Sequence, residues 1–562
     1  VSVIKNAWNL GKGIFFDKPH RKKALLLLIL SIIFEFGLVY CQYILSYWNN
    51  DFYTALQNFD RAALYNAITK FCLLVVMFIT VVALQYTFQS KLIILWRKWM
   101  TELYINKWLL HKSYFGINLF HNQNDNPDQR ISEDINSFVN LTITLFLGLL
   151  GSVITLASFL FMLWALSGDT KFKLFGLEIN IHGYFVWIAV IYSIVGTLIT
   201  YIVGKRLTTL GYLQEKKEAN FRFALIRLRE NAESIALYEG NSYEKNVFRS
   251  AIEEVVKNFN AIIAVTRNLK SWNSLYINIS TILPIAAALP KFFAKEVHLG
   301  GLMQIHSAFI QVKSALSFLI SSFSVIASYK AVINRLVEFN QHVEMWNNKI
   351  INSNLKLSYQ GEMGIHLKNI ELRLPNNKIL LNNVTISFEK GQSYLITGRN
   401  GSGKSTLIKL IKGIWPFANG EIELPAEPKL FFIPQKIYMP LGTLKSILAY
   451  PFGKIDEDLV KDLLKQFNIA DLETRLDNEE PWATNLSIGE QQKISIVRAI
   501  IASPKILIMD ESTSALTEKD EELAFNLIKK FLHNTTIISV GHRSSLKKYH
   551  SYEINLEDYK EL

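Results

Sequence analysis

Long apolar runs recur six times within roughly the first 340 residues of the chain and do not recur after them. Each run has about the 20 residues that a helix needs to cross a bilayer. From about Gly361 the apolar segments become short and strand-like, which is typical of a soluble α/β domain. We therefore expect a membrane domain over residues 1–345 and a soluble domain over residues 346–562. The predicted spans are Ala24–Leu45, Ile68–Phe88, Phe138–Leu166, Tyr184–Val203, Leu275–Phe293 and Leu302–Ala327.

Basic residues flank these spans unevenly. Lysines and arginines gather in the N-terminal segment and in the long connections after spans two and four, whereas the other three connections hold few. Basic loops stay in the cytosol, so the N-terminus and the soluble domain are both predicted to be cytosolic. These loops also explain the net charge of +12, and no aromatic-rich basic patch or nucleic-acid fold signature predicts a nucleic-acid partner. Cys41 and Cys72 both lie in apolar segments, which predicts neither a disulfide framework nor a metal site.

The two long cytosolic connections keep a helical periodicity, so we expect the spans to continue as helices far into the cytosol. Residues 126–131 and 229–234 lie in these connections. Each is either a short helix that docks on the soluble domain or an ordinary solvated loop. The chain begins at Val1 rather than at methionine, which leaves open what precedes it.

Several polar residues fall inside the predicted spans. Glu35 lies in span one, and because an intramembrane carboxylate is energetically costly, we hypothesise a coupling role for it. Span six carries Gln304, Gln311 and several serines at helical spacing, which either line a water-filled cargo cavity or pack helices together. Lys313 in the same span must pair, face water or extend to the membrane surface. The serines of this stripe are Ser307, Ser314, Ser321, Ser324 and Ser328.

A glycine-rich loop stands between an apolar strand-like run and a helical segment in the soluble domain. It fits the phosphate-binding pattern G-x-x-x-x-G-K-[ST], in which backbone N–H groups and a helix N-terminus hold phosphate. We expect Lys404 to reach the β- and γ-phosphates of ATP and Ser405 to bind Mg²⁺. The residues of this loop are Gly398, Arg399, Asn400, Gly401, Ser402, Gly403, Lys404, Ser405 and Thr406.

A second motif lies about 105 residues further on. Four apolar residues, 506–509, precede Asp510 and Glu511, as expected of a buried parallel strand that ends in two carboxylates. Asp510 is predicted to hold Mg²⁺, directly or through water, and Glu511 to polarise the attacking water.

Between these motifs, Asn485-Leu486-Ser487-Ile488-Gly489-Glu490-Gln491-Gln492 is similar to the signature of the ATP-binding cassette transporters. The resemblance covers the whole chain. It implies an exporter-type membrane helical bundle of six transmembrane helices with a C-terminal α/β P-loop nucleotide-binding domain, and ATP hydrolysis that drives transport. In this family the signature residues Ser487, Gly489 and Glu490 face the P-loop of the other subunit, which implies a homodimer or pairing with a similar half-transporter.

The same resemblance assigns roles to two further residues. Gln435, after the strand-like run 431–433, resembles the glutamine that links Mg²⁺ and nucleotide to the membrane domain. His542, after the strand Thr536–Val540, resembles the histidine that contacts the γ-phosphate.

Three departures stand out against the family pattern. Ile488 and Glu490 replace a usual glycine and glutamine in the signature, and Thr517 stands where an aspartate is usual. Residues 372–374 are Leu-Arg-Leu, where an aromatic residue normally stacks on adenine. Because Lys404, Asp510 and Glu511 are all present, we expect ATP hydrolysis to be retained.

In the membrane half, Tyr47–Tyr53, Leu95–Trp99, Asn126–Asp134 and Phe221–Ala236 resemble the bacterial SbmA/BacA-type group with a fused cassette, which is similar to peroxisomal and lysosomal half-transporters. This resemblance implies a bacterial inner-membrane importer of bulky hydrophilic cargo, such as cobalamin or antimicrobial peptides. Three alternatives stay open: export of fatty acyl or lipid-like cargo, a proton-driven carrier with a regulatory cassette that depends on Glu35, and a catalytically weak cassette protein that acts as a regulator or receptor subunit. The last is disfavoured because Glu511 is intact.

Overall fold

The computed structural model describes residues 2–120, 126–174, 177–359, 364–426 and 429–560. The chain forms two compact units. Residues 1–107 and 126–341 form the membrane unit, and residues 108–125 and 342–562 form the nucleotide unit. Residues 108–125, from the connection after span two, therefore group with the nucleotide unit. A single boundary at residue 345 would place them in the membrane domain.

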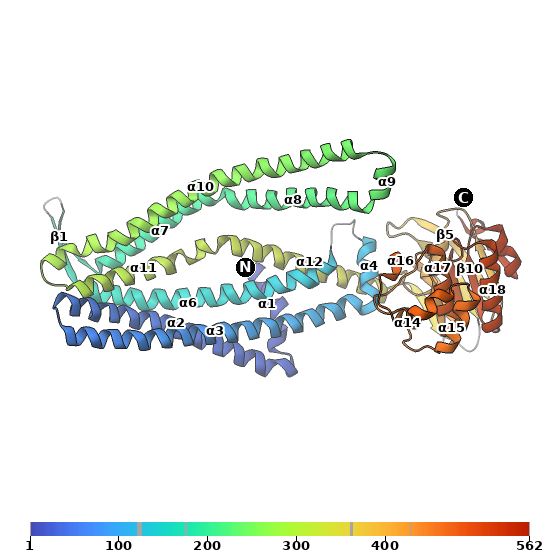
Figure 1. Ribbon diagram of the computed structural model, residues 1–562, viewed down its shortest axis with the longest axis horizontal. Coiled ribbons are helices and arrows are strands. Elements are labelled where there is room, and N and C mark those ends of the chain that lie inside the picture. The colour runs from blue at the N-terminus through green and yellow to red at the C-terminus, as the bar shows by residue number, and fades with distance from the viewer. Residues whose placement is uncertain (1, 121–125, 175–176, 360–363, 427–428, 561–562) are drawn as a thin grey trace. The chain divides into compact units, whose positions relative to one another are not determined.

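Within the described residues, six helices of the membrane unit are long and apolar enough to cross a bilayer, which confirms the predicted number of spans. Figure 1 shows them running along the unit. The longest single helix, Asn241–Phe293, has 53 residues and measures about 80 Å at 1.5 Å per residue, far more than the roughly 30 Å of a hydrocarbon core. The helices are α2 (Lys18–Gln57), α3 (Arg61–Leu109), α6 (Ile135–Ser167), α7 (Tyr184–Gly204) continued by α8 (Arg206–Glu230), α10 (Asn241–Phe293), and α11 (Leu299–Ser321) continued by α12 (Phe323–Ile351).

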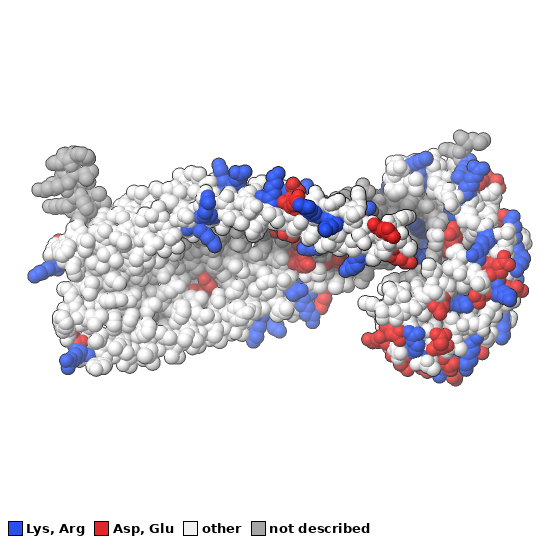
Figure 2. Space-filling view, turned by 45° about the horizontal axis from the view of Figure 1, so that its top comes forward, with Lys and Arg blue, Asp and Glu red and all other residues white. Residues whose placement is uncertain are grey.

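The surface of the membrane unit has an apolar part and a charged part. On the face shown in Figure 2, a broad band of the unit carries hardly any charged side chain, while lysines, arginines and carboxylates gather over the helical extensions. This is the pattern that a bilayer-spanning bundle with hydrated extensions requires, because charges are costly in hydrocarbon.

One span differs from the prediction, and one connection has a structure for which no prediction was made. Span six, predicted over Leu302–Ala327, is interrupted between Ser321 and Phe323. The Ser321 hydroxyl donates to the carbonyl of Phe318 at 2.9 Å, and such side-chain bonds compete with the regular helix ladder. The connection between spans three and four is a hairpin of antiparallel strands, β1 (Asp169–Leu174) and β2 (Leu177–His182).

Short helices accompany the long helices of the unit. α9 (Ala232–Leu237) stands at the turn between α8 and α10, as Figure 1 shows, so the second candidate segment contains a short helix. The first candidate segment contributes α5 (Pro127–Gln129) and η3 (Arg130–Asp134), which lead directly into α6. An N-terminal pair of short helices, α1 (Ser2–Gly11) and η1 (Lys12–Phe15), precedes α2.

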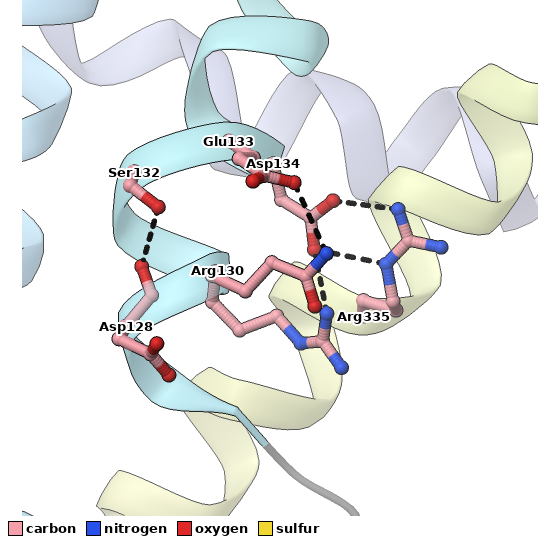
Figure 3. A network of polar contacts seen from close by, with 7 residues as sticks. Asp128, Arg130, Ser132, Glu133, Asp134 and Arg335 are labelled. Carbon is pink, nitrogen blue, oxygen red and sulfur yellow. Dashed lines mark hydrogen bonds and ion pairs between the residues drawn. The ribbon is translucent and has the colours of Figure 1, made fainter. Parts of the chain in front are cut away.

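A buried carboxylate joins η3 to α12 (Figure 3). Asp134 is only 4% exposed and accepts hydrogen bonds from Arg130 at 3.0 Å and from Arg335 at 2.8 and 2.5 Å. Two guanidinium groups thus compensate one buried negative charge, which is the condition for burying it without a large penalty. The contact fixes the start of α6 to the extension of span six.

The nucleotide unit contains two sheets. A five-stranded parallel sheet has the order β11 (Tyr552–Asn555), β6 (Ser393–Thr397), β10 (Thr536–Val540), β9 (Ile506–Asp510), β8 (Leu430–Ile433). A four-stranded sheet has the order β3 (Leu355–Tyr359), β7 (Ala418–Leu424), β4 (Ile365–Arg373), β5 (Ile379–Phe388). Every residue of β10 is buried, as expected of a central parallel strand with both faces covered.

The segment α4 (Ser113–Phe120) packs against the core of the nucleotide unit, where its Phe115 and Leu119 lie against the cluster that contains Trp346. Trp346 is fully buried, and its indole N–H donates to the carbonyl of His111 at 2.9 Å. Gly116 leaves room for the ring, because a Cβ there would lie 1.9 Å from it. This contact explains why residues 108–125 group with the soluble part of the chain.

Candidate functional site: the nucleotide site

The P-loop connects β6 to α13 (Lys404–Ile411), as the sequence predicts. Gly398, Gly401 and Gly403 have φ values of 147°, 78° and 99°, which are accessible to glycine and strained for other residues. A Cβ at Gly403 would also lie 2.9 Å from the side chain of Leu380. The loop is thereby held so that α13 begins at Lys404 and presents its N-terminus, a site suited to phosphate.

Lys404 is buried and its ammonium donates to the carbonyls of Gly398 at 2.8 Å and Arg399 at 2.9 Å. Burial lowers the pKa of Lys404, and the nearby carboxylates of Glu511 and Asp510 oppose that shift. The ammonium is thus kept at the loop by weak, neutral acceptors. Phosphate oxygens are stronger acceptors for a cation, so the same group can turn to them.

Asp510 ends β9 and faces the P-loop. Burial raises the pKa of Asp510, while a hydrogen bond from the Ser405 hydroxyl opposes the shift. The pair supplies two oxygens of the kind that Mg²⁺ prefers, and Mg²⁺ completes its shell with water and substrate phosphates. The residues therefore fit the metal that the sequence predicts at Ser405 and Asp510.

Three residues predicted from separate motifs meet at Glu511. Its carboxylate accepts a hydrogen bond from the Gln435 amide at 2.8 Å and lies 3.5 Å from Nε2 of His542. Glu511 has a φ of 48°, a left-handed conformation that is costly for a residue with a side chain. Its backbone N–H is held by the carbonyl of Val540 at 2.9 Å. Such strain is retained where the surrounding structure fixes a functional side chain.

The signature region begins the helix α17 (Ile488–Ala502). Ser487 caps this helix: its hydroxyl accepts from the backbone N–H of Glu490 at 3.3 Å, and the Glu490 carboxylate accepts from the backbone N–H of Ser487 at 2.8 Å. Glutamate serves this reciprocal cap as well as the usual glutamine, which gives a physical account of the departure at Glu490. The side chain of Ile488 is 67% exposed, and Gly489 follows it in the first turn.

Two residues to which the sequence analysis gave no role connect the loops of the site. Gln492 accepts from the backbone N–H of Ala515 at 3.0 Å and donates to the Ser514 hydroxyl at 3.3 Å. Arg543 donates to the carbonyl of Leu516 at 2.9 Å and also to that of Ser514. The loop after Glu511 is therefore tied to both the signature helix and the His542 loop. The one available signal was that both residues stand next to a motif.

Thr517, which stands where the family has an aspartate, caps the following helix α18 (Glu518–Phe531). Its hydroxyl accepts from the backbone N–H of Asp520 at 3.2 Å. Threonine is a good helix cap, so the residue has a structural role here that does not require a carboxylate.

A glutamate side chain near the end of the chain also contacts the P-loop. Glu557 in η6 (Leu556–Tyr559) accepts a hydrogen bond from the backbone N–H of Arg399 at 2.9 Å. No local pattern in the sequence points to this contact, which spans 158 residues. The adenine site stays unassigned: Leu372 is fully buried, and Arg373 pairs with Glu371 at 2.5 Å.

The polar residues predicted in the membrane spans separate into different environments. Gln304 is 1% exposed and accepts from the Asn50 amide at 2.9 Å, so it joins α11 to α2 and does not line a cavity. Gln311 is half-buried on α11. Glu35 accepts a hydrogen bond from the Gln85 amide at 3.0 Å. Its carboxylate packs against Gly151, where the absence of a side chain leaves room for it, because a Cβ there would lie 2.4 Å from the carboxylate.

The fold and this site define a membrane protein with a fused P-loop ATPase. Residues 13–293 match the family model of the ABC transporter transmembrane region 2, and residues 381–514 match that of the ABC transporter ATPase. An ABC transporter ATP-binding protein of Haemophilus influenzae is 33% identical over 99% of this chain and 92% of its own length. The inner membrane ABC transporter ATP-binding protein YddA of Escherichia coli is 32% identical over 94% of this chain and 93% of its own length.

The chain therefore belongs to the ABC transporter family, and its activity is ATP hydrolysis coupled to transmembrane transport. It is also similar to the human lysosomal cobalamin transporter ABCD4, with 26% identity over 93% of this chain and 89% of that protein. A bacterial Atm1-family ABC exporter solved with ATP bound has the same fold, with a TM-score of 0.74 at 16% identity over 96% of this chain and 94% of that one. This match confirms the predicted exporter-type fold.

Proposed function

We propose that two copies of this chain form a transporter that uses ATP hydrolysis to import a bulky hydrophilic solute across the bacterial inner membrane. The observation that carries the proposal is the meeting of Gln435 and His542 at Glu511, beside a P-loop, in a chain whose other half is a membrane bundle. An intact catalytic carboxylate favours a working ATPase over a regulatory subunit with an inactive cassette.

The arrangement supports a division of labour among the residues of the site. Lys404 and the N-terminus of α13 hold the β- and γ-phosphates, and Ser405, Asp510 and Gln435 hold Mg²⁺, which supplies charge neutralisation when bound. Glu511 orients water and accepts its proton, and His542 lies where it can contact the γ-phosphate.

A homodimer is supported by the composition of one chain. Each chain supplies one P-loop and one signature, and the family resemblance implies that each P-loop is completed by the other subunit's signature. Ser487 and Gly489 begin a helix whose N-terminus is a second phosphate cradle. Among the described residues, no hydrogen bond or ion pair joins Ser487 to the P-loop of its own chain.

A hydrophilic cargo is supported by the similarity to the lysosomal cobalamin transporter and by the resemblance of the membrane motifs to the SbmA/BacA-type group. Clusters of basic residues at the N-terminus and in the long connections support a cytosolic N-terminus and ATPase. The alternative cargo is a fatty acyl or lipid-like molecule moved outward.

Proton coupling is a second candidate, favoured by one contact. Glu35 lies in α2 with a neutral amide, Gln85, as its hydrogen-bond donor, and no described cation pairs with it. A carboxylate with neutral partners can exchange a proton at lower cost than one in an ion pair. This candidate predicts transport that survives Glu511→Gln and stops when the proton gradient is collapsed.

The deciding experiment uses purified protein in liposomes with the ATPase units facing outward. Labelled cobalamin or a labelled proline-rich peptide is placed inside the vesicles or in the bath, ATP is added outside, and wild type is compared with Glu511→Gln. ATP-dependent loss of cargo from the lumen, absent in the variant, is the expected result and corresponds to import into the cell.

Other outcomes discriminate among the alternatives. ATP-dependent accumulation in the lumen means export and contradicts import. ATP hydrolysis without movement of either solute contradicts the hydrophilic cargo and directs the search to lipids. Transport unchanged in Glu511→Gln but abolished by a protonophore selects the proton-coupled carrier instead.

A further inference from the structure

Lys313 lies in the middle of α11 and has neutral neighbours. Its ammonium donates to the Ser280 hydroxyl at 2.8 Å and lies 5.4 Å from the centre of the Tyr276 ring. Within the described ranges of the chain, no carboxylate forms an ion pair with it. A cation inside a membrane span is normally paired, because an uncompensated charge is costly there. The contacts therefore cradle the ammonium without neutralising it.

The aromatic side of this cradle is rigid. The Tyr276 ring stacks on Tyr192 with centroids 4.7 Å apart and planes within 7°, and Trp272 stacks at 6.2 Å. Gly196 leaves the necessary room, since a Cβ there would lie 2.0 Å from the Tyr276 ring. Locked side chains of this kind hold their polar ends in place before a ligand arrives.

Three hydroxyl groups in the same place lack normal hydrogen bonds. The Tyr276 hydroxyl faces those of Ser193 and Ser317. Among the described residues, these three buried oxygens have only one another as neighbouring polar groups, at more than an ordinary hydrogen-bonding distance. Ser193 and Tyr276 are 1% and 7% exposed. Buried hydroxyls are nearly always satisfied, so this cluster has donors to offer a further oxygen.

A cavity of about 350 Å³ adjoins this cluster. Tyr276 and Ser317 belong to its wall, and so do Ser321 and Ser324 of the predicted serine stripe. Its other polar residues include Thr200, which accepts from Trp272 at 3.0 Å, and the exposed Lys205. The volume lies in the range of about 300–1,000 Å³ that is usual for small-molecule sites.

We propose that Lys313, Tyr276, Ser193 and Ser317 form a cargo subsite for an anionic oxygen group, a carboxylate or a phosphate. The inference rests on the proposed transport function and specifies its cargo class. The ammonium supplies the opposite charge and the three hydroxyls supply donors, while the neighbouring cavity holds the adjoining part of the molecule. A neutral or cationic cargo leaves Lys313 without a counter-ion, so the subsite selects against it.

The test measures equilibrium binding to purified full-length protein in lipid nanodiscs without nucleotide. Two pairs of labelled probes separate the two anion sources: a hexapeptide with four glutamates against the same peptide with four glutamines, and cobalamin against cobinamide, which lacks the nucleotide loop with its phosphodiester. We expect the anionic member of at least one pair to bind about tenfold more tightly or better, as charge-assisted hydrogen bonds require.

Four variants connect the preference to the subsite. Lys313→Gln should remove it, and Lys313→Arg should retain it because the cation is kept. Tyr276→Phe keeps the stacked ring and removes one donor, so it should weaken the anionic probe several-fold. Lys295→Gln, which removes an exposed cation outside the cluster, should change nothing.

Equal binding of both members of each pair, binding of neither, or a preference unchanged in Lys313→Gln overturns the assignment. Because binding is measured without ATP, its failure is separate from failure of ATP-driven transport in liposomes. Cargo movement with no anionic preference would remove the subsite and leave the transporter.

Discussion

The nucleotide unit and the membrane unit both bury charged groups, and they compensate them differently. In the nucleotide unit, Asp510 and Glu511 lie close enough to the Lys404 ammonium to interact with its charge, in addition to their hydrogen bonds with Ser405 and Gln435. In the membrane unit, the contacts of Glu35 and Lys313 among the described residues are with neutral groups. The first arrangement holds catalytic groups in register before ATP binds. The second leaves a charge that a proton, a cargo or a conformational change can still satisfy.

Asp134 provides the contrast within the membrane unit itself. It is buried between Arg130 and Arg335 (Figure 3), whose guanidinium groups donate three hydrogen bonds to it. A fully compensated charge of this kind is structural, whereas a partly compensated one is available for function. Each of the following experiments tests one side of that distinction.

The largest effect is expected at Glu511. Replacing it with glutamine removes the carboxylate that we propose polarises water, which should lower the rate of ATP hydrolysis by about 10²- to 10⁴-fold while leaving ATP binding intact. Phosphate release and nucleotide binding by purified protein measure the two properties. Glu518→Gln removes an exposed carboxylate nearby and should be neutral. A rate within about tenfold of wild type would assign the base to another residue.

Asp134→Ala should produce the next largest effect, on stability. It leaves two guanidinium groups without their buried partner, a loss of about 3–5 kcal/mol. Thermal unfolding in detergent, followed by helical circular dichroism, measures the shift. The matched control is Asp128→Ala, because Asp128 is exposed and only its backbone carbonyl accepts from Ser132. Equal midpoints for the two variants would mean that Asp134 is not structural.

A smaller effect is expected at the signature helix. Glu490→Ala removes hydrogen bonds to the backbone and hydroxyl of Ser487 and should destabilise the first turn of α17 by about 0.5–1.5 kcal/mol. Glu490→Gln can still close the cap, so its unfolding midpoint should match wild type. Chemical denaturation measures both. If the glutamine variant is as unstable as the alanine variant, the negative charge matters rather than the cap.

The smallest effect concerns pH. His550 is buried between the Ser539 hydroxyl at 2.7 Å and the Leu546 carbonyl at 2.8 Å, and burial lowers the pKa of His550 below its ordinary value of 6.5. Between the folded and unfolded pKa values the unfolded chain binds more protons, so stability falls as the pH drops below about 6.5.

Replacing His550 with glutamine should therefore flatten the acid side of the stability profile. Unfolding midpoints between pH 7.5 and pH 5 measure the slope, with His533→Gln as the exposed control. A slope unchanged from wild type in His550→Gln would show that other groups cause the acid sensitivity.

Much of the ATP site was predictable because its chemistry is encoded in contiguous residues. A glycine-rich loop binds phosphate through its own consecutive backbone N–H groups, so its sequence pattern is sufficient to recognise it. Asp510 and Glu511 directly follow an apolar strand, so their position at the end of that strand is set by their place in the sequence. Glu557 and Arg543 were not predictable, because each reaches the site from a distant element through contacts to backbone atoms. Such contacts leave no motif.

The membrane unit shows the opposite balance. Six spans follow from hydrophobicity, because a bilayer selects length and composition independently of neighbouring helices. Which face of a span meets water, cargo or another helix does not follow from that signal. The serine stripe and Gln304 share a helical face, yet Gln304 is sealed against Asn50 while Ser321 and Ser324 line a cavity.

The amino-acid sequence by itself determined the number of spans, the α/β ATPase fold that follows them and the order of the P-loop, signature and carboxylate motifs along the chain. Those features depend on local spacing and on burial of apolar surface, both of which a single chain carries in its order of residues. Only the tertiary structure decided that Asp134 is clamped by Arg335, that Lys313 lies over Tyr276, and that three hydroxyls meet beside it. Those features depend on which helices become neighbours, since side-chain polar contacts form across elements far apart along the chain.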